Sequence, residues 1–126
     1  MPLPQSLARF NRDVTNHLMR PLAGRLPGYA VIVHVGRKSG AHYETPVNAF
    51  EYGGGYAIPL TYGADSQWVR NVVAAGTATL RIKGEDVPVT APEVFRDESR
   101  AAVPAAVRVA LGALDVNEFL HVQRIP

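Results

Sequence analysis

The sequence contains no cysteine, and this absence excludes disulfide bridges, thiolate metal sites, iron–sulfur clusters and cysteine nucleophiles together. Long apolar runs are also missing, since none approaches the roughly 20 residues that a membrane-spanning helix needs. The first residues lack the apolar core and small-residue cleavage site of a signal peptide. We therefore expect a cytoplasmic protein that folds around an ordinary hydrophobic core.

Reactive side chains are too scattered to form an evident catalytic or metal centre. The histidines are His17, His34, His42 and His121, and none stands at a metal-ligand spacing, so no metal site is predicted. Ser39 lacks the G-x-S-x-G setting of a serine hydrolase, and no two acids are placed for acid–base catalysis. Such a chain can still be an enzyme if a bound cofactor carries the chemistry.

Composition and charge favour one folded domain with an anionic ligand. Hydrophobic residues make up 47% and charged residues 19% of the 126 residues, as in a folded domain with its own core. The net charge of +2 hides an asymmetry: the first 42 residues hold six basic and one acidic residue, and the remainder holds seven basic and ten acidic. This basic third favours a phosphorylated or carboxylated ligand or an anionic membrane surface. Nucleic acid is disfavoured because no nucleic-acid motif is found.

Residues 1–24 are predicted to form an amphipathic helix. Leu7, Phe10, Val14 and Leu18 recur at three- and four-residue spacing, and arginines occupy much of the other face. Two roles stay open. The helix can simply pack on the domain, or it can act as a lid or contact a membrane through its arginine-rich face.

The rest of the chain predicts a mainly β fold with short helices. Strands are expected at 29–33, 43–50, 56–60, 77–82, 87–91 with an extension over 93–95, and 116–124. Helices are expected at 67–75, from Asp97 to Pro104, and at 105–111. Pro46 and Pro59 interrupt two strands, so the strand of Pro46 should lie at an edge or bulge, and the sheet should resemble an open barrel.

A turn after the first strand carries the strongest functional pattern. Gly36 and Gly40 frame Arg37, Lys38 and Ser39. Such a turn can aim backbone N–H groups at one point as an anion-binding nest, and its cations and hydroxyl can add contacts to phosphate or carboxylate. The alternative is a solvated hairpin tip. The turn is not a P-loop, because the spacing G-x-x-x-x-G-K-[ST] is absent.

Two ordered motifs resemble those of a known family. Gly36-Arg37-Lys38-Ser39-Gly40, followed by Thr45-Pro46-Val47, resembles the G-R-K-S-G-x-x-x-x-x-P-L signature of the deazaflavin-dependent nitroreductase family. The stretches 61–63 and 68–75 resemble that family's cofactor loop and its W-Y-x-N-L-x-A-N-P helix. The resemblance implies an α+β, mainly β fold: a split β-barrel of about six to seven mostly antiparallel strands, with an N-terminal helix and short flanking helices. It further implies a single deazaflavin-binding domain over residues 1–126.

The resemblance also implies coenzyme F420 as cofactor, and a set of residues that bind it. The turn would hold its phosphate, the strand after the turn would line its ring, and the loop and helix would complete the site. Cofactor binding is thereby assigned to Arg37, Lys38, Ser39, Gly40, Tyr43, Thr45, Pro46, Val47, Thr61, Tyr62, Gly63, Trp68 and Asn71. Trp68 and Asn71 would brace the loop, Trp68 being equally compatible with plain core, and Thr61 and Tyr62 are the catalytic candidates.

The implied activity is hydride transfer from reduced deazaflavin to an electron-poor acceptor such as a quinone, a nitro compound or an activated alkene. The reduced coenzyme would come from an F420-reducing dehydrogenase. No tyrosine follows Tyr62, whereas the best-known nitroreductases of this family have a tyrosine-rich segment there, so nitroimidazole reduction is disfavoured. The alternatives are a non-catalytic binder of a fatty acid or other anionic ligand, and a barrel that binds flavin mononucleotide (FMN) or heme. The chain is expected to be a monomer or a homodimer.

Overall fold

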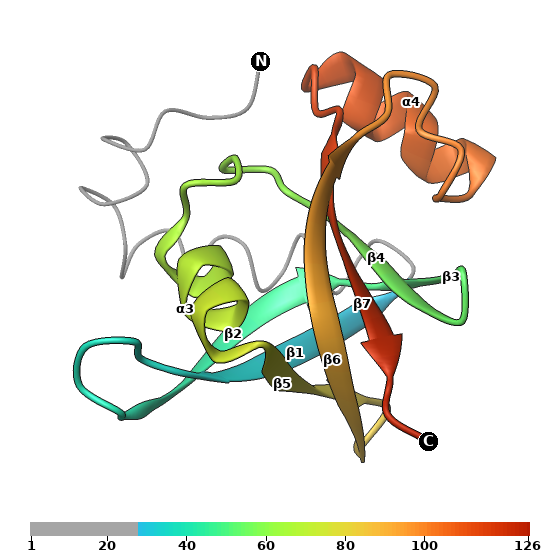
Figure 1. Cartoon of the computed structure of the whole chain (residues 1–126). Coiled ribbons are helices and arrows are strands. Elements are labelled where there is room, and N and C mark those ends of the chain that lie inside the picture. Colours follow the sequence, from blue (N-terminus) through green and yellow to red (C-terminus); the bar gives the residue numbers. More distant parts are fainter. Residues whose placement is uncertain (1–27) are drawn as a thin grey trace.

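The computed structural model of the chain describes residues 28–126, so the predicted helix over 1–24 lies outside the described residues (Figure 1). The described part forms seven strands and two helices. In chain order these are β1 (Tyr29–Val35), β2 (His42–Asn48), β3 (Phe50–Tyr52), β4 (Gly55–Pro59), α3 (Gln67–Ala75), β5 (Thr77–Ile82), β6 (Glu85–Arg96), α4 (Ala105–Ala113) and β7 (Glu118–Arg124).

All seven strands belong to one antiparallel sheet in the order β2-β1-β5-β6-β7-β4-β3. The sheet is strongly bent, so that β1, β2 and β5 run across the lower halves of the upright strands β6 and β7 (Figure 1). Edge strand β2 comes into contact with β4, and the sheet thereby curls into a split barrel. The predicted mainly β, antiparallel α+β fold is confirmed. So is the edge position of Pro46, whose missing N–H removes no central ladder bond.

The long strand β6 supplies the sharpest bend in the sheet. Its first half pairs with β5 and its second half with β7, and the register along β7 shifts between Thr90 and Glu93. Ala91, within this bulge, has a left-handed backbone with φ of 53°. The predicted strand over 87–91 and its extension are therefore one strand, which begins at Glu85 because Lys83 and Gly84 alone form the hairpin turn.

Two other expectations about elements are wrong. The stretch from Asp97 to Pro104 forms turns instead of a helix. The Asp97 carboxylate does accept hydrogen bonds from the amides of Ser99 and Ala101, at 3.0 and 3.1 Å, but Arg100 then takes a left-handed φ of 56° that no helix can continue. The strand expected over 43–50 is divided into β2 and β3 by Ala49, whose N–H donates to the Gly28 carbonyl instead.

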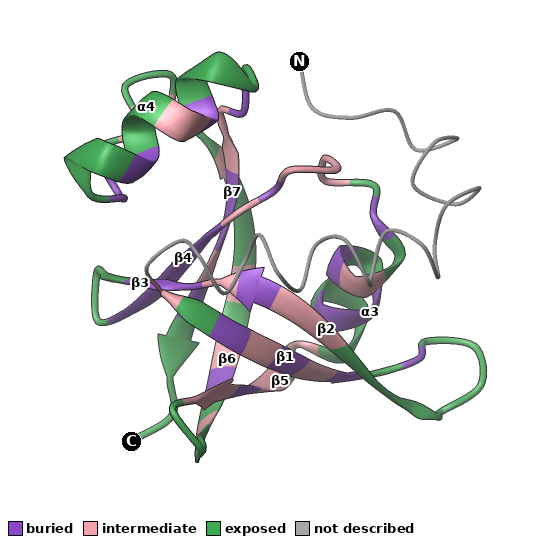
Figure 2. Cartoon of the chain, turned by 180° about the vertical axis from the view of Figure 1, so that it is seen from behind, coloured by how far each residue is buried: buried purple, intermediate pink, exposed green. Residues whose placement is uncertain are grey.

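Two hydrophobic clusters hold these elements together, and both contain residues that are fully buried (purple in Figure 2). The larger cluster fills the barrel and takes Val69 and Val72 from α3. The smaller one lies beneath α4 and centres on Phe119. Helix α3 ends as expected at Gly76, whose left-handed backbone lets its N–H donate to Val72 O at 2.8 Å. The larger cluster thus fixes α3 against β1, which leads into the turn of Arg37, Lys38 and Ser39 between Gly36 and Gly40; we call this the basic turn.

We expect Gly55 to be essential for the pairing of β4 with β7. A Cβ atom there would lie 2.7 Å from Gln123 Cα and closer still to the Val122 carbonyl, and these backbone atoms of a sheet cannot move aside. Gly55→Ala should therefore lower the free energy of unfolding in chemical denaturation by about 3 kcal/mol. Gly54→Ala is the matched control. It meets nothing within 4 Å and should lose only about 1–2 kcal/mol through its φ of 80°. Equal losses would contradict this account.

Candidate functional site

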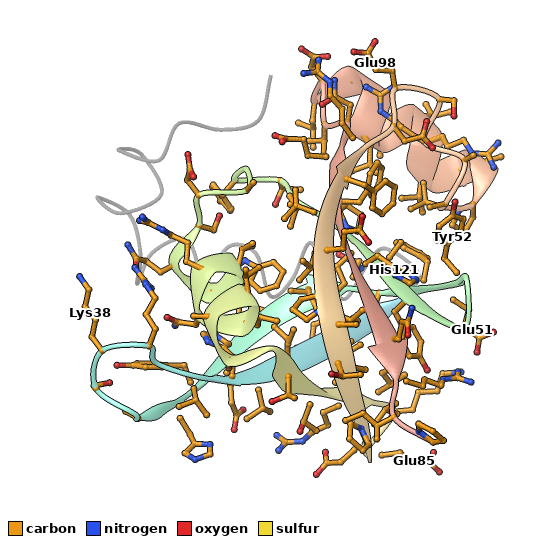
Figure 3. The ribbon with its side chains drawn as sticks, in the orientation of Figure 1. Lys38, Glu51, Tyr52, Glu85, Glu98 and His121 are labelled. Carbon is orange, nitrogen blue, oxygen red and sulfur yellow. The ribbon has the colours of Figure 1, made fainter. Side chains whose placement is uncertain are left out.

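The basic turn between β1 and β2 is closed by its own hydrogen bonds. Gly36 N–H donates to Ala41 O at 2.8 Å, and Gly40 N–H donates to Gly36 O at 2.9 Å. The Ala41 amide donates to Ser39 Oγ at 3.2 Å. The Lys38 side chain extends from the tip, away from the sheet (Figure 3). Within residues 28–126, only the amides of Lys38 and Ser39 remain in this turn without an acceptor, so the expected anion nest is reduced to two adjacent N–H groups.

Arg37 is bound to helix α3. Its backbone N–H and its Nη1 both donate to Asn71 Oδ1, at 3.2 and 2.7 Å. Its Nη2 donates to Gln67 Oε1, one helical turn earlier, at 2.9 Å. A guanidinium has five N–H donors, so Arg37 keeps others for a ligand while it joins the turn to the helix.

Asn71 continues these contacts into the sheet. Its Nδ2 donates to His34 Nδ1 at 3.2 Å, and His34 Nε2 donates to Thr45 Oγ1 at 3.0 Å. Because Asn71 Oδ1 already accepts from Arg37, its amide nitrogen must face His34, and the imidazole proton must then sit on Nε2. We call Thr45, His34, Asn71 and Arg37 the polar chain; it crosses from β2 through β1 and α3 to the basic turn.

His34 is buried, with 4% of its surface exposed, and it is neutral at physiological pH. Burial lowers its pKa from 6.5 to about 4, because the charged imidazolium loses its hydration. The ring also stacks on Tyr43, with centroids 5.8 Å apart. A neutral ring is what the polar chain requires, since only unprotonated Nδ1 can accept from Asn71.

The remaining predicted site residues lie on β2 and on the loop after β4. Thr45 and Pro46 are half-buried, Val47 is buried, and the Tyr43 hydroxyl lies 3.4 Å from Ser39 Oγ. The loop residues 61–63 are half-buried. Val47, Leu60 and Trp68 all contribute to the larger hydrophobic cluster, so the base of this loop and the strand after the turn share one core.

Trp68 and Asn71, both predicted to brace the loop over 61–63, make different contacts in the structure. Trp68 packs against the core, and the hydrogen bonds of Asn71 go to Arg37 and His34. Sequence reasoning overlooked His34 and Gln67 as parts of the site. A signal existed for each: His34 occupies an inward position of a strand whose burial alternates, and Gln67 stands four residues before Asn71 on one helix face.

Helix α3 also borders a shallow surface groove of about 380 Å³. Arg37 and Arg70 lie along it, with Val73 and Val94 among its apolar lining. Within residues 28–126, no cluster of three or more histidines and acids is placed to hold a metal ion. The helices of this described part are too short or too polar to cross a membrane.

The class of this protein is a small split antiparallel barrel with a basic turn fixed to one of its helices. Residues 7–117 match the family model described as F420H(2)-dependent quinone reductase. This is most of the chain, which therefore belongs to the F420H(2)-dependent quinone reductase family.

Solved structures agree with this fold. One, described as "Structure of F420-H2 Dependent Reductase (FDR-A)", has a TM-score of 0.52 and 21% identity, covering 76% of this chain and 94% of that one. Another, described as a domain-swapped dimer, has a TM-score of 0.52 and 20% identity, covering 90% of this chain and 98% of that one. At such identities the likeness shows the fold alone. A comparison with curated proteins gives no match.

We expect the stability of the protein to fall as pH falls through the range in which unfolded His34 takes up a proton. The folded-state pKa is below 6.5, so the unfolded chain binds more protons between pH 6.5 and 4. His34 should therefore contribute its full stabilisation above pH 6.5. Between pH 7.5 and 4.5 this contribution should fall by about 2–3 kcal/mol.

The measurement is urea denaturation of the wild type and of His34→Gln across this pH range. Subtracting one profile from the other removes the effects of other titrating groups. The wild type should lose more stability than the variant on acidification, and parallel profiles would refute the role given to burial of His34.

Proposed function

We propose that this protein transfers a hydride from reduced coenzyme F420 to a quinone. Membership of the F420H(2)-dependent quinone reductase family is the observation that carries the proposal. The acceptor is the finer part, and nitro compounds and activated alkenes are the other electron-poor candidates. Reduced coenzyme would be supplied by an F420-reducing dehydrogenase in the cytoplasm.

The basic turn fits the anionic end of such a cofactor. Lys38 is exposed, and in the described part of the chain its ammonium group makes no ion pair, so it is available for a phosphate or carboxylate. The amides of Lys38 and Ser39 belong to the same turn, and Arg37 uses only two of its five guanidinium N–H groups within the described structure. Charge-assisted hydrogen bonds to phosphate are about twice as strong as neutral ones.

The ring of the cofactor would lie toward β2 and the loop after β4. Thr45 and Pro46 are half-buried and Val47 is buried, so this strand offers mainly apolar side chains and one hydroxyl, which suits a planar ring with a few polar edges. When bound, the deazaflavin supplies the hydride. The protein positions the ring and excludes water from it.

The loop hydroxyls are the proposed contribution of the protein to the chemical step. A quinone that accepts a hydride also takes up a proton, and negative charge develops on its oxygen before the proton arrives. Thr61 and Tyr62 are half-buried residues of this loop that carry hydroxyl groups. A hydrogen bond from either one would stabilise the developing oxyanion.

The assembly of the protein is proposed to be a monomer or a homodimer. One similar structure is described as a domain-swapped dimer, which supports testing the dimer first. Contact of the N-terminal segment with a membrane remains a separate proposal, based on its arginines and its apolar row.

Removing the charge at the tip of the turn should weaken cofactor binding. We expect Lys38→Ala to raise the Kd for coenzyme F420 by roughly 10- to 150-fold, the equivalent of about 1.5–3 kcal/mol for a charge-assisted hydrogen bond. Fluorescence titration measures this, and the thermal midpoint should hardly change. Lys83→Ala, at the exposed β5–β6 turn, removes the same charge elsewhere and serves as the control. Equal effects of the two variants would count against a specific phosphate contact.

Turnover of the coenzyme distinguishes an F420-dependent reductase from a protein that only binds the coenzyme. Pre-reduced coenzyme should be oxidised at least tenfold faster with a quinone plus protein than with the quinone alone, as followed by coenzyme absorbance. If the coenzyme binds but no quinone, nitro compound or alkene accelerates its oxidation, the protein is a binding module. An absorbance scan with FMN and with heme tests the alternative cofactors.

A further inference from the structure

The polar chain bonds a buried asparagine, Asn71, to the basic turn. Membership of the reductase family does not by itself explain this contact. We propose that Asn71 is a positioning residue that holds Arg37, and with it the backbone of the turn, so that Lys38 and Ser39 face the anionic end of the cofactor. The identity of this ligand rests on the proposed function. The hydrogen-bond chain itself can be tested without any ligand.

Asn71 fixes the backbone of the turn as well as a side chain. Both the main-chain N–H and the guanidinium of Arg37 donate to its one carbonyl oxygen, at 3.2 and 2.7 Å. Among the described residues, no other side chain from outside residues 36–41 bonds to a backbone group of this turn. Without Asn71, the turn would keep its internal bonds but could rotate relative to the barrel.

Burial makes this contact stronger than the parallel one from Gln67. Asn71 is 6% exposed, whereas Gln67 lies on the surface. Water competes for the Gln67–Arg37 bond, and it is largely excluded from the Asn71–Arg37 bond. Gln67 therefore supports the orientation of Arg37 and Asn71 decides it.

The two Arg37 donors set the direction of the Asn71 amide, because a reversed amide would place Nδ2 against both of them. That direction sets the tautomer of His34. Asn71 Nδ2 donates to His34 Nδ1, so the imidazole proton sits on Nε2 and is donated to Thr45. The hydrogen bonds of His34 in the described structure go to Thr45 and Asn71, its ring stacks on Tyr43, and the Arg37 cation is bonded to the far side of Asn71. The chain thus links the strand expected to line the ring with the turn expected to hold the phosphate.

The first test compares two variants of α3. Asn71→Ala should raise the Kd for coenzyme F420 about tenfold in calorimetry and should raise its KM similarly, with kcat within twofold of the wild type. Val72→Ala removes buried packing from the same helix without touching the polar chain, and it should leave the Kd within twofold in the folded protein. Equal weakening by both variants would show that Asn71 acts only through the stability of α3, which would overturn the proposal.

A double-mutant cycle then tests the route through Arg37. In an Arg37→Gln background, Asn71→Ala should raise the Kd by only about threefold instead of tenfold, because the side-chain bond is already lost while the main-chain N–H of residue 37 still donates to Asn71. A full tenfold loss in that background would overturn the proposal, since the Arg37 side chain would then have no part in the effect of Asn71.

Asn71→Asp provides a readout that needs no cofactor and preserves side-chain shape. Its carboxylate still accepts from Arg37, but it presents an oxygen to His34 Nδ1 and should drive protonation there. We expect the His34 pKa, followed by ¹H–¹⁵N NMR of the imidazole, to rise by more than one unit above about 4.

An unmoved His34 pKa in Asn71→Asp would overturn the polar chain. If the wild type bound no coenzyme while this pKa rose as expected, the proposed function and the ligand named here would be wrong. The hydrogen bonds of the polar chain would still be supported. The two failures are therefore distinguishable.

Discussion

The hydrogen-bond chain from Thr45 through His34 and Asn71 to Arg37 is the contact on which the functional end of the molecule depends. His34 and Asn71 are among the few buried polar residues of the described structure, and each would cost free energy if it lost its partners. Arg37 donates to Asn71, Asn71 donates to His34 and His34 donates to Thr45, so a single arrangement satisfies all of them. Such a chain orders two strands, a helix and a turn relative to one another, which hydrophobic packing alone would do less specifically.

The shape of the sheet positions the polar chain. Antiparallel strands twist, and the bulge at Ala91 increases the bend, so that β2 returns to lie against β4. The barrel closes through contacts between β2 and β4, without hydrogen-bonded pairing of these strands, so β2 remains an edge strand. Pro46 is tolerated there, and backbone groups stay accessible beside the basic turn. A turn at such an edge is open to a ligand on one side and fixed to α3 on the other. An anionic cofactor needs that combination of access and rigidity.

The cations of the basic turn and the hydroxyl groups of the loop over 61–63 lie on different segments of the chain. The basic turn has no group suited to acid–base work, and the loop over 61–63 has hydroxyls but no charge. Family membership resolves this division, because a cofactor that carries the hydride needs only positioning at one end and a hydrogen bond at the other. The same division explains why the acceptor is harder to assign than the cofactor: an apolar acceptor requires few specific contacts.

The sequence by itself determined the elements with strong local signals and the motif that identifies the cofactor. Alternation marked most strands, and Gly76 marked the end of α3. The anion site at the glycine-framed turn stays a prediction. Local signals misled at Asp97, where a good capping residue precedes an Arg100 that takes a left-handed conformation. The roles within the site were decided only by tertiary structure. Arg37 and Lys38 are adjacent cations of the same turn, and no local pattern distinguishes the one fixed to α3 from the one exposed at the tip. His34 and Asn71 are 37 residues apart, and they meet because the barrel core packs α3 onto β1.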